Sequence, residues 1–257
     1  MNDILRFVSL QSGSKGNCLF VESGNVRLLF DAGLTGTQTK QRLESFGVDI
    51  ATVQAVIISH AHNDHIRYAG VLQRQYHLPV WMTSGTFHEV LAMHKSGRVS
   101  EPHLFNSGET LQFGTVKIET IPTTHDAQEG VCFVVDNGTA RLGIMTDLGS
   151  RFFGLKEIIA TLDGIYLESN YDHEMLVSGP YPEELKQRIQ GDHGHLSNSD
   201  AADLLVKSKR LRWACLGHLS AHNNCPTVAL ATHRKILGET LPLSIAPRHG
   251  VSEMFEL

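Results

Sequence analysis

Four side chains that commonly bind metal ions lie within six positions of the segment VIISHAHNDH, directly after an apolar run. His60 and His62 are two residues apart, and in an extended chain this spacing puts both imidazoles on one side. Asp64 and His65 follow where the chain can turn into a helix, so one tight loop can offer two ligands to each of two ions. Imidazole and carboxylate groups suit Zn(II), Mn(II) and Fe(II). The segment therefore predicts a site for divalent metal ions.

Four more apolar runs are followed by a side chain of the metal-binding type. Asp31 follows VRLLF, and His125 comes four residues after VKIETI. Asp147 follows RLGIMT, and His218 follows RWACLG. Any one of these is compatible with an ordinary polar cap, but if the strand ends share one edge, the side chains converge on a rigid support for metal. A carboxylate can bridge two ions through its two oxygens, and Asp147 is the candidate for that role.

The elements that must position these residues alternate with turn signals, such as the Asp-Asn-Gly hairpin turn at 136–138. Apolar runs predict strands at residues 5–10, 18–22, 26–30, 55–58, 80–82, 116–121, 131–135, 140–145, 164–168 and 213–216. Helices are predicted at residues 37–46, 68–76, 86–94, 153–160, 182–190, 199–209 and 228–237. This order predicts two packed sheets with helices outside, an α/β (α+β) sandwich. No linker or repeat marks a boundary, so residues 1–257 are predicted to form a single domain.

The composition limits the kind of protein. Apolar residues make up 41% and charged residues 19%, which is ordinary for a globular protein with a sizeable core. No apolar run approaches a membrane span and the first residues lack a secretory pattern, so we expect a cytoplasmic protein without membrane contact. The count of 15 histidines is unusual and supports a metal site.

The charge balance bears on nucleic acid as a partner. A formal net charge of −5 argues against general adhesion to nucleic acid, although a local basic groove remains compatible with it. The densest basic segment, KSKRLR at residues 207–212, is either a solvated helix end or a phosphate-binding segment.

The segment HAHNDH matches the HxHxDH motif and so resembles the metallo-β-lactamase superfamily. His125, Asp147 and His218 follow the order of its later motifs, and Asp31 in LLFDAG is similar to its first. Ser59 stands where many members have threonine. The resemblance implies a four-layer αββα sandwich with a hydrolytic centre of one or two Zn, Mn or Fe ions. It assigns His60, His62 and His125 to one ion, Asp64, His65 and His218 to a second, and Asp147 to both. It also implies that Asp31 orients a ligand through a hydrogen bond, and His222 is the alternative to His218.

Longer segments, among them SLQSGSKGNCLFVESGNVRLLFDAGL and LGHLSAHNNCP, are similar to the YycJ (WalJ-like) subfamily over about residues 5–250. That resemblance implies a metal-dependent nuclease with 5′-to-3′ exonuclease activity on DNA. The alternative is a small-molecule metallo-hydrolase that cleaves a cyclic phosphodiester, thioester or lactone. A non-catalytic metal-binding protein is disfavoured because the set of candidate ligands is complete. The metal identity and the oligomeric state stay open.

The segment GDHGHLSN contains His193 and His195 just before a predicted helix. On its own it is a loop with a helix cap at Ser197 or Asn198. Phosphodiesterases of the superfamily have a histidine in a comparable turn, which implies that His195 assists the leaving alkoxide or the phosphoryl oxygens. The expected catalytic residues are His195, Asp64 and Asp147.

Several polar loop residues are candidates for substrate contact, and each has an ordinary structural alternative. The SGSKGN loop is not a P-loop, and it is either a plain turn or a contact for the substrate backbone. The residues after strand 164–168 either line the cleft or cap the following turn. The candidates are Ser14, Asn17, Asn170, Asp172, His193, His222 and Asn223.

Overall fold

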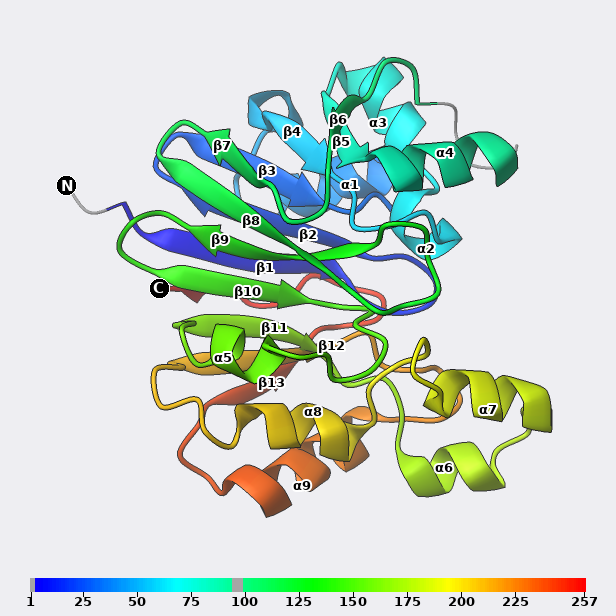
Figure 1. Cartoon of the computed structure of the whole chain (residues 1–257). Helices are drawn as coiled ribbons and strands as arrows, with labels where there is room; N and C mark the ends of the chain where they lie inside the picture. Colours follow the sequence, from blue (N-terminus) through cyan, green and yellow to red (C-terminus); the bar gives the residue numbers. More distant parts are fainter. Residues whose placement is uncertain (1–2, 94–98) are drawn as a thin grey trace.

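The sheets that the apolar runs predict are present in the computed structural model of the chain, which describes residues 3–93 and 99–257. Figure 1 shows two sheets packed face to face with helices outside both. The first sheet contains, in spatial order, β14 (Phe255–Glu256), β1 (Leu5–Gln11), β2 (Cys18–Ser23), β3 (Val26–Phe30), β4 (Ala55–Ile57), β5 (Val80–Thr83) and β6 (His103–Phe105). The second contains β13 (Leu243–Ile245), β12 (Trp213–Gly217), β11 (Gly164–Glu168), β10 (Arg141–Met145), β9 (Val131–Asp136), β8 (Val116–Pro122) and β7 (Thr110–Phe113). The predicted α/β sandwich is confirmed.

Each sheet is antiparallel on one side and parallel on the other. Strands β1 to β3 pair antiparallel, and the pairs from β3 to β6 are parallel. Strands β7 to β10 pair antiparallel, and those from β10 to β13 are parallel. Parallel neighbours end at the same edge of a sheet, where open α/β sheets carry their ligand sites. The residues that follow β3, β4, β10, β11 and β12 are therefore delivered to shared edges.

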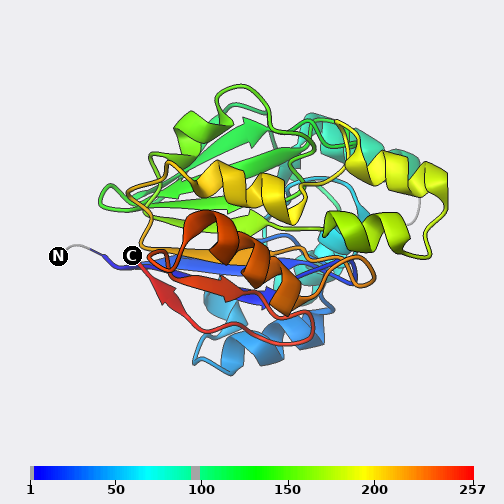
Figure 2. The same ribbon diagram turned by 90° about the horizontal axis from the view of Figure 1, so that it is seen from below.

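Helices cover the outer face of each sheet, which gives the four layers. The first sheet is covered by η1 (Ile50–Thr52), α1 (Gly36–Glu44), α2 (Asn63–Ile66), α3 (Ala69–Tyr76) and α4 (Ser84–Met93). The second sheet is covered by α5 (Leu155–Ile159), α8 (Asn198–Leu205) and α9 (Pro226–Leu237), with α6 (His173–Ser178) and α7 (Glu183–Gln190) at one end (Figure 2). The last residue of the predicted helix 86–94 lies outside the described residues. Within residues 3–93 and 99–257, no helix has the length and hydropathy needed to cross a membrane.

Successive side chains of a strand point to opposite faces of its sheet, and each face packs into a separate apolar layer, one between the two sheets and one under the helices. In β3, Leu28 and Phe30 point between the sheets, while Leu29 packs on the outer face with Leu43 of α1. Phe30 meets Phe133 of the other sheet, with ring centroids 5.0 Å apart. Because both faces of each sheet are covered, the strands read as nearly continuous apolar runs. Close packing fixes the sheets to each other, and so fixes the loops at their ends.

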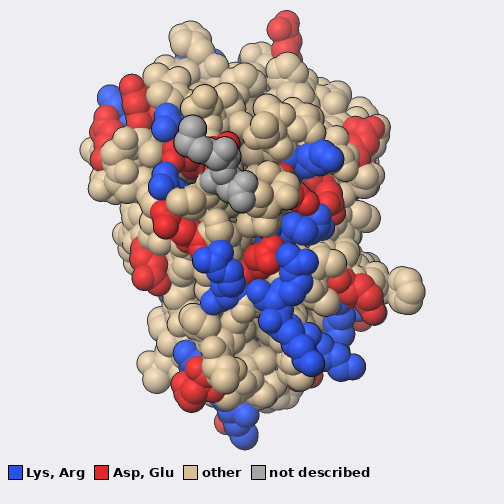
Figure 3. Space-filling view, turned by 90° about the vertical axis from the view of Figure 1, so that its left-hand side faces the viewer, with Lys and Arg blue, Asp and Glu red and all other residues tan. Residues whose placement is uncertain are grey.

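The basic segment 207–212 lies far from the predicted metal ligands. The segment precedes β12, whereas His218 follows the same strand. The length of β12 therefore separates the segment from His218, and the two lie toward opposite ends of the sandwich. The end away from His218 faces the viewer in Figure 3, where Lys and Arg are interspersed with Asp and Glu. Arg210 pairs there with Asp163 at 2.8 Å. Of the two interpretations of this segment, the solvated surface agrees better with its position.

Candidate metal centre

Three residues that follow strands have a backbone conformation that is uncommon for residues with a side chain. Asp31, Asp147 and His218 have φ values of 63°, 50° and 54°. Asp and His enter this left-handed region more readily than most residues. Such conformations cost about 1–3 kcal/mol each and cluster at functional sites. The turns direct the three side chains into one buried group around His65.

The loop after β4 carries the densest group of candidate ligands. His62 has an extended backbone and is the N-cap residue of α2, and His60 lies two residues before it. Asp64 and His65 belong to this helix of four residues, which precedes the helix predicted at residues 68–76 and was not itself predicted. His60 and His62 belong to one group of candidate ligands, and Asp64 and His65 belong to another.

His60, His62 and His125 form the first cluster, with ligand atoms within 4.8 Å of one another. The Nδ1 atom of His125 donates to the carbonyl oxygens of His193, at 3.0 Å, and Gly194, at 2.9 Å. Carbonyl oxygens only accept, so this pair fixes the tautomer of His125. Its Nε2 atom then lies 3.2 Å from Nδ1 of His62.

Asp64, His65 and His218 form the second cluster. Nε2 of His65 and Nε2 of His218 each lie 3.4 Å from Oδ2 of Asp64. The opposite nitrogen of His65, Nδ1, donates to the buried carboxylate of Asp31 at 2.7 Å. This hydrogen bond joins Asp31 to one of the predicted ligands, and such a bond can hold a ligand ring in one orientation. Asn17 Nδ2 adds a contact of 3.1 Å to Oδ2 of Asp64.

Asp147 lies between the two clusters. Its Oδ2 atom is 3.0 Å from Nε2 of His65, and its Oδ1 atom is 3.6 Å from Nε2 of His125. It also forms a third group of candidate ligands with His60 and His65. Burial opposes ionisation, but His218 and His65 hold the pKa of Asp147 well below its usual value. A buried, ionised carboxylate therefore faces both clusters.

These groups fit divalent cations. Nε2 of His60 is buried and has no hydrogen-bond partner in the described part of the chain. An unsatisfied buried polar atom costs about 1–3 kcal/mol, and a bound cation would remove this penalty. Burial lowers the pKa of His60 and of His125, so both imidazoles keep a free lone pair at neutral pH. Neutral imidazole with carboxylate is the donor set of Zn, Mn and Fe sites.

Glu168 is a site residue that the sequence analysis missed. It ends β11, is fully buried, and its Oε1 atom lies 2.7 Å from Nδ1 of His195 and 3.2 Å from Nδ1 of His218. Burial opposes ionisation, but His195 and His218 lower the pKa of Glu168 to about 2. In return, Glu168 outweighs burial and raises the pKa of His195. The signal was present, because Glu168 is the first charged residue after the run GIYL, as Asp31 is after VRLLF.

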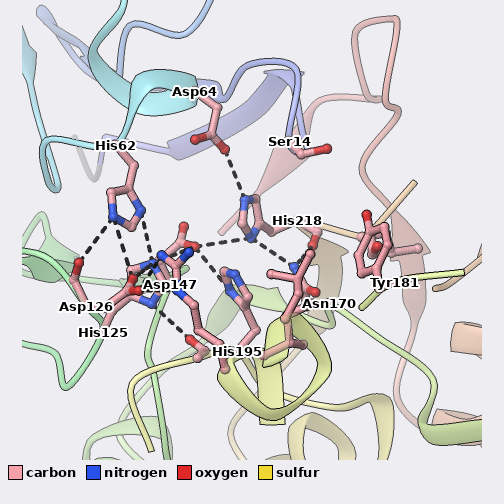
Figure 4. A pocket seen from close by; sticks show the side chains of 16 residues that line it. Ser14, His62, Asp64, His125, Asp126, Asp147, Asn170, Tyr181, His195 and His218 are labelled. Carbon is pink, nitrogen blue, oxygen red and sulfur yellow. Dashed lines mark hydrogen bonds and ion pairs between the residues drawn. The ribbon is translucent and has the colours of Figure 1, made fainter. Parts of the chain in front are cut away.

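A cleft of about 250 Å³ opens beside the clusters. Figure 4 shows His62, Asp126 and His125 on one side of it, and Asn170 and Tyr181 on the other. Its lining includes the predicted catalytic residues Asp64, Asp147 and His195. Of the predicted substrate contacts, Ser14 and Asn170 line the cleft.

The other predicted substrate contacts have different surroundings. Asn17 is buried beside Asp64, and Asp172 caps α6 by accepting from the Met175 N–H at 3.0 Å, which is the structural alternative for that residue. The side chain of His193 is exposed and bonds the carbonyl oxygen of Thr124 at 2.5 Å. None of these three lines the described cleft.

The two remaining candidates follow His218 in the chain. Asn223 is fully buried, and its main-chain N–H donates to the hydroxyl of Ser220 at 3.2 Å. His222 is exposed and contacts the edge of Tyr181, with ring centroids 5.7 Å apart. His218 thus lies in the second cluster, whereas His222 belongs to none of the candidate ligand groups of the described residues.

The fold and the clusters define a metal-dependent hydrolase. The family described as "Metallo-beta-lactamase superfamily" matches residues 12–156. "Exodeoxyribonuclease YycJ" of Bacillus anthracis is 33% identical over 98% of this chain and 94% of its own length. "Exodeoxyribonuclease WalJ" of Streptococcus pneumoniae serotype 2 is 34% identical over 88% of this chain and 86% of its own length. The chain therefore belongs to the metallo-β-lactamase superfamily and, within it, to the group that contains YycJ and WalJ.

A solved structure agrees with the fold. The crystal structure of the metallo-β-lactamase fold protein YhfI from Bacillus subtilis has a TM-score of 0.76 at 17% identity, and the match covers 99% of this chain and 100% of that chain. At such low identity the likeness bears on the fold alone. The resemblance drawn from the HxHxDH motif is confirmed, and membership of this family implies a divalent metal.

Proposed function

We propose that the chain is a dinuclear metal-dependent phosphodiesterase that degrades DNA as an exonuclease in the 5′-to-3′ direction. Two relatives that are 33% and 34% identical over most of their length carry the name exodeoxyribonuclease, which supports DNA as the substrate. The direction rests on the resemblance of the sequence to this group. Zn or Mn, with Fe as a further option, suits the donor set.

The proposed ligands divide into the two clusters. His60, His62 and His125 would hold one ion, Asp64, His65 and His218 the other, and Asp147 would contact both. Ions bound by such a set lower the pKa of water and stabilise negative charge on a phosphoryl group. Asp64 lines the cleft and stays ionised, because His65 and His218 outweigh its burial and lower its pKa. Its carboxylate can therefore accept a hydrogen bond from the attacking water.

The observation that carries the proposal is the pair formed by His195 and Glu168. Nδ1 of His195 donates to Glu168 at 2.7 Å, and the ring lines the cleft. Glu168 raises the pKa of His195, which favours the imidazolium at neutral pH. An imidazolium beside the scissile group can donate a proton to the leaving alkoxide. This matters for a DNA diester, because the alcohol that leaves has a high pKa. Esters with acidic leaving groups need such a donor much less.

One observation favours a second candidate, the small-molecule metallo-hydrolase. The cleft has a volume of about 250 Å³, just below the range of about 300–1,000 Å³ that is typical of small-ligand pockets. A cyclic phosphodiester, thioester or lactone would fit a space of this size without further contacts outside it.

The test uses protein reconstituted with Mn(II) or Zn(II) on duplex and single-stranded DNA labelled at either end. Release of mononucleotides from the 5′ end, blocked by phosphorothioate linkages at that end alone, is the expected result. Asp147→Ala, which removes the shared carboxylate, serves as the inactive control. Hydrolysis of bis(p-nitrophenyl) phosphate without any degradation of DNA would favour the small-molecule hydrolase, and release from the 3′ end would reverse the direction.

A further inference from the structure

Helix α7 turns its apolar side chains toward the cleft. The helix has no buried residue, yet Leu185 and Ile189, one turn apart, both line the cleft. A surface helix normally directs such an apolar stripe at the protein core. Here the stripe forms part of the wall of the cleft, which several of the candidate metal ligands also line.

Tyr181 also lines the cleft. Figure 4 shows its ring across the pocket from His62 and Asp126, which lie on the opposite side. Pro180 and Pro182 flank it in the sequence GPYP. A proline fixes its own φ and restricts the residue before it to extended conformations. The aromatic ring is therefore presented from a stiff turn, which lowers the entropy lost when a ligand packs on it.

The wall is tied to the catalytic residues. Nε of Arg188 on α7 donates to Oδ2 of Asp126 at 2.7 Å, next to His125 in the chain. The main-chain N–H of His195 donates to the carbonyl oxygen of Ile189 at 3.0 Å. Figures 1 and 2 both place α6 and α7 at the end of the sandwich where α2 lies. The apolar wall thus has a defined position relative to His195 and the first cluster.

We propose that Tyr181, with Leu185 and Ile189, binds the nucleobase of the terminal nucleotide and thereby selects nucleic acid over simpler phosphodiesters. This inference rests on the proposed function. A nucleotide has an anionic phosphate and a flat, largely apolar base. The cleft has matching parts, because imidazoles and carboxylates line it together with an aromatic ring and two aliphatic side chains. Stacking on an aromatic ring tolerates every base, as a nuclease without sequence preference requires.

The experiment compares DNA that ends in a normal nucleotide with DNA that ends in an abasic tetrahydrofuran residue. Tyr181→Ala should raise KM for the normal end about 5- to 100-fold, with kcat little changed, because stacking acts mainly in substrate binding. The abasic end should show a high KM already with the wild-type protein and no further rise in the variant. Tyr181→Phe keeps the ring and should behave as wild type. Val177→Ala is the matched control, since Val177 is exposed on α6 and does not line the cleft.

The outcomes separate this inference from the proposed function. Equal losses on normal and abasic ends, or no change on either, would overturn the role of Tyr181 as a base platform. If the wild-type protein does not degrade DNA, the proposed function fails independently. Thymidine 5′- and 3′-(p-nitrophenyl phosphate) beside methyl p-nitrophenyl phosphate then test the platform alone. Tyr181→Ala should weaken hydrolysis of the thymidine esters selectively, and an equal effect on the methyl ester would contradict the inference.

Discussion

Replacement of His195 by alanine removes the proposed proton donor and leaves the proposed metal ligands in place. Nδ1 of His195 lies 2.7 Å from Glu168, which outweighs burial, raises the pKa of His195 and so favours the protonated donor. A positioned general acid contributes about 10²–10⁴-fold to rate. At about 1.36 kcal/mol per tenfold change, this is about 2.7–5.4 kcal/mol of activation free energy. We expect His195→Ala to lower kcat on DNA by this factor.

The leaving group separates proton donation from electrostatic stabilisation. The alkoxide that leaves from DNA needs a proton, whereas p-nitrophenolate leaves without one. The loss caused by His195→Ala should therefore be much smaller on bis(p-nitrophenyl) phosphate than on DNA. Metal content, measured by mass spectrometry on the same preparations, should equal that of the wild type.

His193→Ala is the matched control, because its side chain is exposed and bonds only the carbonyl oxygen of Thr124 among the described residues, while its main chain is retained. Such a surface change should stay within about 0.5 kcal/mol of wild type. Equal losses for His195→Ala on both esters would remove the acid role and leave electrostatic stabilisation. Activity that does not change on either ester would refute the assignment. Loss of metal would make His195 a ligand instead, together with Asp147, Glu168 and His218.

Three further predictions concern the neighbours of these groups. Glu168→Gln removes the charge that raises the pKa of His195, so the alkaline limb of the pH–rate profile on DNA should move to lower pH; an unshifted limb would contradict the pair. Asp31→Asn weakens the hydrogen bond that orients His65 and should lower metal affinity about 10–100-fold in competition titrations with a chelator, with a wild-type value as the contrary result. Despite burial, carboxylates raise the pKa of His65 well above its usual value and that of His218 to about 10. Metal loading at pH 8 should therefore release a proton from His218, detectable by calorimetry in buffers of different ionisation enthalpy, and affinity should rise with pH. Loading without proton release would contradict this.

The interior of the fold follows from the sequence, and the edges of the sheets do not. Every predicted strand is present. Most of them are buried on both faces, which produces a long apolar run, whereas β8 alternates buried residues with exposed or half-buried ones. The strands that the pattern missed, β6, β7, β13 and β14, are edge or near-terminal strands with exposed or half-buried residues. Edge strands pair on one side only and tolerate polar residues, so their sequences resemble loops.

The positions of strand ends predicted the candidate ligands, but they did not predict the other residues that line the cleft. Six of the seven predicted ligands lie in the two clusters and Asp147 lies between them, since each of the seven follows a recognisable strand or belongs to the HxHxDH segment. Glu168 also lies at the end of an apolar strand, β11, and was not predicted as a site residue. Tyr181 carries no signal of metal chemistry, and its place in the cleft depends on how α6 and α7 pack against distant loops. Contacts of that kind depend on tertiary structure and leave no local pattern.

The ratio of metal to protein tests the central claim most directly. The structure brings together two clusters of buried ligands with Asp147 between them, and we propose that they hold two divalent ions. After gentle purification and reconstitution, elemental analysis of the wild-type chain should give about two ions per chain, and Asp147→Ala should lose both because two adjacent cations then lack a shared negative charge. Fewer than one ion per wild-type chain, or two ions retained in a fully active Asp147→Ala variant, would contradict the account.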